Sequence, residues 1–181
     1  QHYLILNRYQ FLPGHIIMAL DNQNEKQGSL LKNHDFKVLS TVLQNANDKG
    51  LAYYNGGIDA GCTQLHKHLQ YVPSLDNPLF DLMAKGEKLP FRYFYEKLED
   101  YDATTIGDSY KRLIEKINNN GSYNFLVSNK TAILVPRLKA RTNDGLLIGS
   151  LSICGHLFAN TDKPNLMHNP IGILKEVCTP N

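Results

Sequence analysis

The stretch from Asn55 to Pro73, NGGIDAGCTQLHKHLQYVP, determines the expected fold and the expected chemistry of this chain. Its second half, His66 to Val72, alternates polar and less polar residues with a period of two, which predicts a β-strand. Residues two apart in a strand point to the same face, at intervals of about 6.6 Å. His66, His68 and Gln70 are therefore expected to share one face, and the residues between them the other.

The first half of this stretch is a glycine-rich loop with Gly56, Gly57 and Gly61. Glycine lets a backbone bend sharply and approach a ligand closely. The N–H groups of such a loop can form an anion-binding nest. A loop of this kind, followed by two imidazoles and an amide on one face, indicates phosphoryl or nucleotidyl transfer through a histidine nucleophile.

A His-x-His pair is also typical of metal sites and of ordinary polar strand faces. A zinc site needs a third and a fourth ligand. The nearest candidates, Cys62, His15 and His34, have no recognisable ligand spacing. Gln70 is a poor zinc ligand but a good hydrogen-bond donor to a phosphate oxygen. The combination favours phosphate chemistry, and no protein metal site is expected.

The composition is that of an ordinary globular domain. The chain has 181 residues, 42% of them hydrophobic and 20% charged, with a net charge of +2. This charge is too small to indicate binding to nucleic acid or to a membrane, and no apolar run approaches the length of a transmembrane helix. Three widely spaced cysteines without a CxxC pair favour a reducing, cytoplasmic location.

The order of the expected elements predicts an α+β fold with a mainly antiparallel sheet and flanking helices. Strands are expected in four parts of the chain outside the central stretch: Tyr3–Asn7 paired with His15–Leu20, Leu51–Tyr54, Phe91–Tyr95, and a hairpin of Tyr123–Val127 with Thr131–Val135. Helices are expected after Asn33, ending at Gly50, then at Asp102–Asn120 and Ile171–Val177. The segment Ser74–Leu89 is expected to be an irregular flap.

Some residues have two possible roles. His15 could reach the site, although a lone histidine at a strand start is more often structural. Asn55 could bind a ribose hydroxyl, but the residue pattern alone favours a role in the turn. The basic cluster of Arg137, Lys139 and Arg141 suits a polyphosphate as well as it suits a solvated loop.

The segment with Gln64, His66-Lys67-His68 and Gln70 after an Asn-Gly loop resembles the diadenosine tetraphosphate (Ap4A) phosphorylases, or ATP adenylyltransferases, of the histidine-triad (HIT) superfamily. The resemblance covers most of the chain, including the hairpin from Leu4 to Leu20 and the segment Ser122–Val127. It implies a HIT-like fold and a single nucleotidyltransferase domain over residues 1–181.

The resemblance implies roles for individual residues. His68 matches the catalytic nucleophile, with His66 and Gln70 as supporting catalytic residues. The positions that match the family's nucleotide contacts are Asn55, Gly61, Cys62, Thr63, Gln64, Gln70, Ser122, Tyr123 and Asn124. Cys62 departs from the small or Ser residue that is common in the family, whereas Thr63 keeps a hydroxyl. Mg²⁺ bound with the polyphosphate is also implied.

The implied reaction is reversible phosphorolysis of Ap4A to ATP and ADP through an adenylyl-histidine. A hexose-1-phosphate uridylyltransferase is one alternative, although such enzymes usually have Pro where this chain has Lys67. An inactive nucleotide-binding protein and a dinucleotide hydrolase are others, and Gln70 disfavours the hydrolase. Family members carry a further segment before the position of Gln1, so this chain is expected to be part of a longer product or to pair with that segment as a separate chain.

Overall fold

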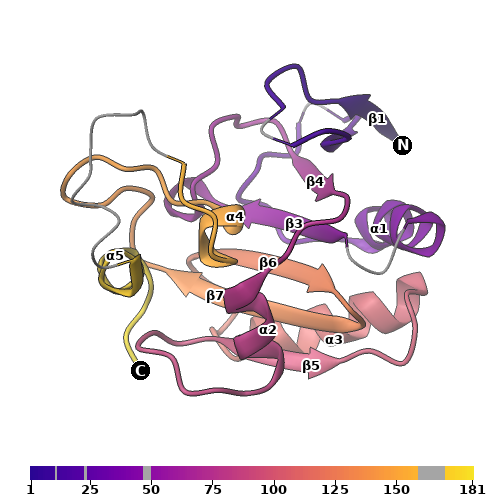
Figure 1. The fold of residues 1–181 in the computed structure, drawn as a ribbon. Helices are drawn as coiled ribbons and strands as arrows, with labels where there is room; N and C mark the ends of the chain where they lie inside the picture. The colour runs from indigo at the N-terminus through magenta and orange to yellow at the C-terminus, as the bar shows by residue number, and fades with distance from the viewer. Residues whose placement is uncertain (11, 23, 47–49, 159–169) are drawn as a thin grey trace.

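The computed structural model describes residues 1–10, 12–22, 24–46, 50–158 and 170–181. Its centre is an antiparallel sheet of seven strands in the order β1-β2-β4-β3-β6-β7-β5 (Figure 1). The strands are β1 (His2–Leu6), β2 (Ile16–Leu20), β3 (Leu51–Gly56), β4 (His68–Val72), β5 (Phe94–Lys97), β6 (Ser122–Ser128) and β7 (Thr131–Arg137). The expected α+β class with an antiparallel sheet is confirmed.

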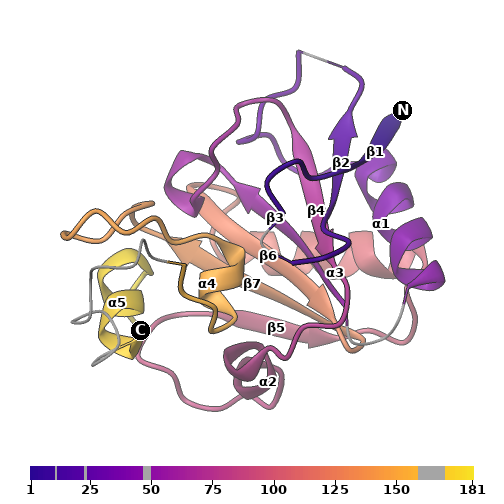
Figure 2. The ribbon, with the colours of Figure 1, turned by 45° about the horizontal axis from the view of Figure 1, so that its top comes forward.

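Helices cover both faces of this sheet (Figures 1 and 2). On one face, α1 (Asn33–Asn45) and α3 (Ala103–Glu115) pack on a core that includes Leu69 and Phe125. The core on the other face includes side chains from three shorter helices, α2 (Pro78–Ala84), α4 (Ser150–Ile153) and α5 (Pro170–Val177). Strand residues alternate between the two cores, as the pleat requires. Within the described ranges, every helix is too short or too polar to cross a bilayer.

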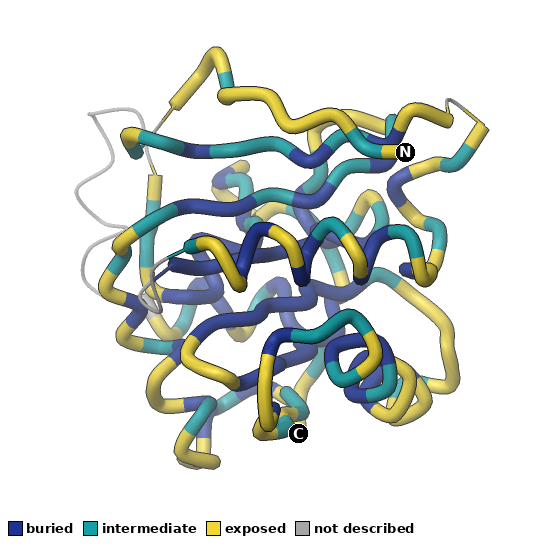
Figure 3. Tube along the Cα trace, turned by 90° about the vertical axis from the view of Figure 1, so that its right-hand side faces the viewer, coloured by how far each residue is buried: buried dark blue, intermediate teal, exposed yellow. Residues whose placement is uncertain are grey.

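The two predicted hairpins are confirmed, because both depend on local alternation and turn residues. β1 pairs with β2, with Ile5 opposite Ile17, and β6 pairs with β7, with Phe125 opposite Leu134. The turn of the second hairpin places Asn129 and its neighbour at positive φ, which suits Asn better than most residues. β1 forms one edge of the sheet and is largely exposed, whereas the central strands are buried (Figure 3).

Several predicted boundaries were wrong. α1 ends at Asn45 with Ala46 as its C-cap, so Gly50 does not cap it. Gly50 precedes β3 instead, where a Cβ would lie 1.9 Å from the Tyr71 hydroxyl. The segment expected to be an irregular flap contains α2. β5 begins at Phe94, later than the aromatic run predicted, and its register places Phe94 opposite Leu134.

Candidate active site

The candidate site lies at the start of β4, beside the loop that follows β3. β3 pairs with β4 only from Leu51 to Tyr53, opposite Val72 to Gln70. Beyond that point the two strands separate. The predicted strand from His66 was therefore too long, because β4 begins at His68 and His66 forms only an isolated bridge with Lys26.

His68 presents one ring nitrogen to the site and uses the other to bind the backbone. Its Nδ1 lies 2.8 Å from the His66 carbonyl oxygen. A carbonyl only accepts, so Nδ1 carries the proton and Nε2 carries the lone pair. The acceptor belongs to the residue two positions earlier in the same segment, so this segment itself fixes the tautomer of His68.

Burial lowers the pKa of His68, more than the hydrogen bond to the His66 carbonyl raises it. The nearby imidazoles of His66 and His15 lower it further. A histidine in this environment stays neutral at neutral pH and keeps the lone pair that a nucleophile needs.

His66 supports the site mainly through its main chain. Its side-chain Nε2 lies 2.5 Å from the carbonyl oxygen of Leu20, the last residue of β2. The ring therefore holds the loop against β2, while its carbonyl oxygen binds His68. The role assigned to His66 as a supporting residue stays a prediction, with this hydrogen bond as its geometric basis.

Gln70 shares a face with His68, as the alternation predicts. Its Nε2 lies 3.5 Å from Nε2 of His68. Its Oε1 lies 2.9 Å from Nε2 of His15 and accepts from the Tyr53 hydroxyl at 3.0 Å. His15 therefore contacts the site, which the sequence left open, whereas nothing in the sequence signalled Tyr53.

Gln27 occupies the gap between the separated strands. Its side-chain amide accepts from the His68 N–H at 2.8 Å and donates to the carbonyl oxygens of His68 and Asn55 at 3.0 and 3.1 Å. Its backbone carbonyl accepts from the Gly57 N–H. Gln27 is 1% exposed, so this buried amide replaces the missing strand pairing. Sequence reasoning missed it because a lone glutamine in a polar loop carries no pattern.

The glycine loop contains two glycines with positive φ angles, which most other residue types rarely adopt. Gly57 and Gly61 have φ angles of 100° and 83°, on either side of the single turn Ile58–Ala60. A Cβ on Gly61 would lie 2.3 Å from the Ile148 carbonyl oxygen. Gly61 is buried and Cys62 is half-buried, whereas Thr63 and Gln64 are exposed beyond them. Burial raises the pKa of the Cys62 thiol, which therefore stays protonated at neutral pH.

We expect Gly61→Ala to lower the free energy of unfolding by about 2 to 4 kcal/mol, because a positive φ and a backbone clash add together. Gly145→Ala is the matched control, since Gly145 has a φ of 82° and open space around its Cβ position. The control should cost only the conformational penalty of about 1 to 2 kcal/mol. Chemical denaturation of both variants measures the difference, and equal losses would contradict the clash.

The predicted nucleotide contacts on β6 are mostly buried. Asn124 is 0% exposed, and its Nδ2 lies 2.8 Å from Oδ1 of Asn55 and 3.0 Å from Oγ of Ser150. The Tyr123 hydroxyl is paired with that of Tyr110. A nucleotide contact through these side chains would require them to exchange partners. Ser122 differs, because it is only partly buried and its Oγ accepts from the backbone N–H of Asp59.

The sequence left open whether Arg137 contacts a polyphosphate or lies in a solvated loop, and the structure supports neither role. Arg137 is 6% exposed, and its Nη1 donates to Oδ1 of Asn124 at 2.6 Å. Its other donors bind the carbonyl oxygens of Val177, Lys139 and Ile148. The guanidinium thus connects β7 to Asn124 on β6 and to the backbone of later segments of the chain. Its donors satisfy carbonyl groups that would otherwise be buried without a hydrogen bond.

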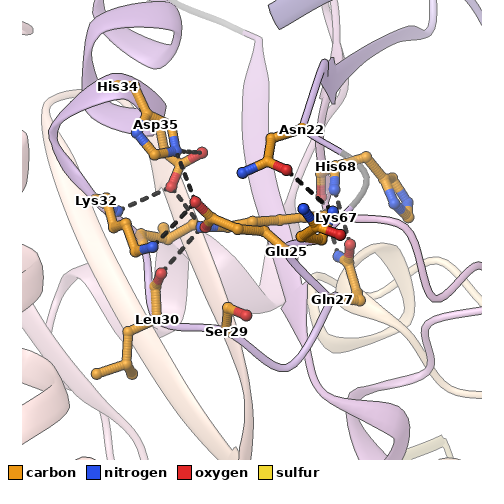
Figure 4. A network of polar contacts seen from close by, with 12 residues as sticks. Asn22, Glu25, Gln27, Ser29, Leu30, Lys32, His34, Asp35, Lys67 and His68 are labelled. Atoms are coloured by element: carbon orange, nitrogen blue, oxygen red, sulfur yellow. Dashed lines mark hydrogen bonds and ion pairs between the residues drawn. The ribbon is translucent and has the colours of Figure 1, made fainter. Parts of the chain in front are cut away.

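Lys67, between the two histidines, points to the opposite face and into a buried ionic cluster (Figure 4). Its ammonium lies 2.7 Å from Oδ2 of Asp35, 3.0 Å from Oε2 of Glu25 and 3.0 Å from the Leu30 carbonyl oxygen. Lys67 and Asp35 are both 0% exposed. The cluster therefore ties the segment His66–His68 to the start of α1.

No group of three or more His, Cys, Asp or Glu side chains suited to a metal ion occurs among the residues that the structure describes. The imidazoles of His15 and His66 lie near His68, but their rings are already hydrogen-bonded to Gln70 and to the Leu20 carbonyl. The Gln70 amide beside His68 suits the oxygens of a phosphate chain more than it suits a directly bound metal. A divalent ion at this site would be held chiefly by a polyphosphate.

Two family models match the chain. "Ap4A phosphorylase N-terminal domain" matches residues 1–96, and "ATP adenylyltransferase C-terminal domain" matches residues 87–180. Their overlap, residues 87–96, includes most of β5, and the single sheet includes strands from both matched regions.

Two curated proteins of Saccharomyces cerevisiae are similar to this chain. Diadenosine 5',5'''-P1,P4-tetraphosphate phosphorylase 2 is 22% identical over 215 residues, which cover 94% of this chain and 66% of that protein. Protein APA1 is 25% identical over 226 residues, which cover 98% and 69%. The chain therefore spans about two thirds of the length of these relatives.

Solved structures show the same fold. The crystal structure of yeast Ap4A phosphorylase Apa2 in complex with Ap4A matches with a TM-score of 0.84 and 24% identity, over 99% of this chain and 74% of that one. The complex of Apa2 with AMP matches with a TM-score of 0.80 and 25% identity, over 99% and 74%. The expected fold is confirmed by these matches.

Proposed function

Because the chain belongs to the Ap4A phosphorylase family, we propose that it phosphorolyses Ap4A to ATP and ADP by reversible adenylyl transfer. The observation that carries this proposal is the geometry of His68. Its Nδ1–H is bound to a backbone carbonyl, so Nε2 carries its lone pair next to an amide donor, and Gln27 links the His68 backbone to Asn55 at the start of the glycine loop. This arrangement suits attack by a neutral imidazole on phosphorus.

In the first step, Nε2 of His68 attacks an α-phosphorus of Ap4A. The new P–N bond forms as the bond to the bridging oxygen breaks, and ATP leaves as an anion. The imidazole keeps its Nδ1 proton and becomes cationic on adenylylation. The His66 carbonyl oxygen, 2.8 Å from Nδ1, stabilises this charge.

In the second step, an oxygen of inorganic phosphate attacks the same phosphorus and displaces His68, which gives ADP and restores the neutral imidazole. Phosphate is already anionic at neutral pH and needs little help from a general base. Gln70 cannot take up a proton as a third histidine could. This property favours transfer between phosphates over hydrolysis of the adenylyl-enzyme.

We propose that the half-buried Cys62, the exposed Thr63 and Gln64, and the backbone of the glycine loop bind the polyphosphate. Mg²⁺ bound by that polyphosphate would offset its charge and would need no protein ligands of its own. We also propose a cytoplasmic location. Three cysteines without a disulfide, Cys62, Cys154 and Cys178, support it.

The proposed function is tested by incubating the protein with Ap4A and Mg²⁺, with and without inorganic phosphate, and separating the nucleotides by chromatography. ATP and ADP in equal amounts, formed only with phosphate, are the expected products. AMP and ATP formed without phosphate would indicate a hydrolase and contradict the proposal. Absence of turnover in both conditions would also contradict it for this chain.

The pH dependence of the first step tests the state of His68. Protonation removes the lone pair, and burial holds the pKa of His68 below its ordinary value. The rate should therefore fall only as the pH drops through a midpoint below about 6.5. Single-turnover release of ATP from Ap4A, measured without phosphate between pH 5 and 8, avoids the titration of phosphate itself. A midpoint clearly above the ordinary histidine value would contradict the assignment.

A further inference from the structure

The side chain of Gln70 belongs to a chain of hydrogen bonds that begins at the loop after β1 and ends at the nucleophile. Nδ2 of Asn7 lies 3.2 Å from Nδ1 of His15, whose Nε2 lies 2.9 Å from Oε1 of Gln70. The Tyr53 hydroxyl donates to the same Oε1 and lies 3.2 Å from Nε2 of His15. We call Asn7, His15, Tyr53 and Gln70 the Gln70 relay.

A backbone group fixes the direction of the relay at its outer end. Oδ1 of Asn7 accepts from the Tyr9 N–H at 3.0 Å, and an N–H can only donate. The amide of Asn7 therefore turns its NH₂ group toward Nδ1 of His15, which must accept. The proton of a neutral His15 then lies on Nε2 and is donated to Oε1 of Gln70.

A second backbone group fixes the direction at the inner end. The His66 carbonyl oxygen accepts from Nδ1 of His68, so Nε2 of His68 accepts as well. The nearest group of Gln70 must then be its NH₂, at 3.5 Å. The two ends require the same orientation of the Gln70 amide, although they lie on different segments and neither depends on the other.

The interior of the relay is shielded from water. His15 is 2% exposed and Tyr53 is 4% exposed. Burial lowers the pKa of His15, which therefore stays neutral with one donor and one acceptor nitrogen. Buried hydrogen bonds of this kind are costly to break, so an amide flip at Gln70 is strongly disfavoured.

We propose that Asn7, His15 and Tyr53 are positioning residues that hold the Gln70 amide with its NH₂ toward the reacting phosphorus. The inference rests on the proposed adenylyl transfer and adds to it the residues that orient its amide donor. When phosphorus occupies Nε2 of His68, that nitrogen no longer accepts, and the N–H of Gln70 donates to an oxygen on phosphorus instead. The relay therefore keeps a donor, and never the amide oxygen, beside the developing charge.

Tyr53→Phe removes only the hydroxyl that orients Gln70. We expect it to lower kcat for phosphorolysis about three- to tenfold with little change in KM, as the loss of one hydrogen bond predicts. Tyr71→Phe is the matched control. The Tyr71 hydroxyl is buried without a hydrogen-bond partner among the described residues, so its loss should leave kcat unchanged.

The same substitution in a Gln70→Ala background separates positioning from a general structural effect. If Tyr53 acts through Gln70, Tyr53→Phe should change the single-turnover rate of the Gln70→Ala protein by less than about twofold. An equal fractional loss in both backgrounds would overturn the proposal, as would an unaltered kcat in the single variant.

The protonation of the two histidines provides a test that needs no activity. Long-range ¹H–¹⁵N NMR spectra of the full chain should show opposite tautomers, with the proton of His15 on Nε2 and that of His68 on Nδ1. A proton on Nδ1 of His15 would overturn the relay. The expected tautomers in a protein that does not convert Ap4A would leave the relay in place and refute the proposed function instead.

Discussion

His68→Ala should reduce the phosphorolysis of Ap4A by at least about 10⁴-fold, because a two-step transfer cannot begin without its nucleophile. Without His68, phosphate would have to attack Ap4A directly, and no covalent intermediate would form. The fold should survive, since the His68 side chain makes its main hydrogen bond to the backbone of its own segment. Initial rates of ADP formation, with circular dichroism as a check on folding, measure the effect.

His34→Ala is the matched control for this substitution. His34 lies at the start of α1, and its side chain is 37% exposed and distant in sequence from the site. Its loss should change the rate by less than about twofold, because its ring lies beside Glu25 and Asp35. These carboxylates are the partners of Lys67, on the side of β4 opposite His68. A His68→Ala protein that retained substantial activity, or that still formed an adenylyl-enzyme, would remove His68 from the role of nucleophile.

Lys67→Met should lower the free energy of unfolding by about 3 to 5 kcal/mol, because it leaves the buried Asp35 carboxylate without its ammonium partner. Burial raises the pKa of Asp35, but hydrogen bonds from His2, from Lys67 and from the backbone N–H of Lys32 outweigh it and hold that pKa below its usual value. The carboxylate is therefore charged at neutral pH. For a chain of this size the loss corresponds to a fall in Tm of about 6 to 20 °C.

Lys111→Met provides the control for charge and side-chain length. Lys111 pairs with Asp108 at 2.8 Å on the exposed face of α3, where both side chains are more than two fifths exposed. Exposed pairs contribute about 0.2 to 1 kcal/mol, so Tm should barely change. A double variant, Lys67→Met with Asp35→Asn, should be less damaged than the sum of the single losses. Strict additivity, or equal effects of Lys67→Met and Lys111→Met, would contradict the role of the cluster.

The sequence predicts those parts of the fold and the site that depend on local patterns. Alternation placed the two hairpins correctly, and apolar spacing placed α1 and α3. The same alternation correctly predicted that His68 and Gln70 share a face and that Lys67 lies on the other. These features follow from strand geometry, which the sequence alone specifies.

The sequence does not predict features that depend on contacts between distant segments. β4 begins two residues late because the Gln27 amide, 41 positions away, takes the place of strand pairing. The side-chain amides of Asn55 and Asn124 could bind a ligand or each other, and the sequence does not distinguish the two. The fold shows that they are hydrogen-bonded to each other and that Asn55 also binds Ser150. His15 and Tyr53 meet Gln70 only after three strands have assembled, so no local signal marks them.

The acidic partners of Lys67 illustrate the same limit. A lysine in an alternating strand is usually expected at a solvated face. Asp35 comes from the first turn of α1 and Glu25 from the loop before it, so their convergence on Lys67 depends on how α1 packs against the sheet. The sequence shows one cationic and two anionic side chains far apart along the chain. The structure shows that Lys67, Asp35 and Glu25 meet in one cluster (Figure 4).

The central claim, that His68 carries the adenylyl group, is tested most directly by trapping the intermediate. The protein is mixed with Ap4A and Mg²⁺ without phosphate, quenched at alkaline pH, where phosphoramidates survive, and analysed by intact-mass and peptide mass spectrometry. We predict an added mass of one AMP moiety on the peptide that contains His68, with ATP released, and its disappearance with formation of ADP when phosphate is added. Absence of the adduct under conditions of turnover, or an adduct on another residue, would contradict the account.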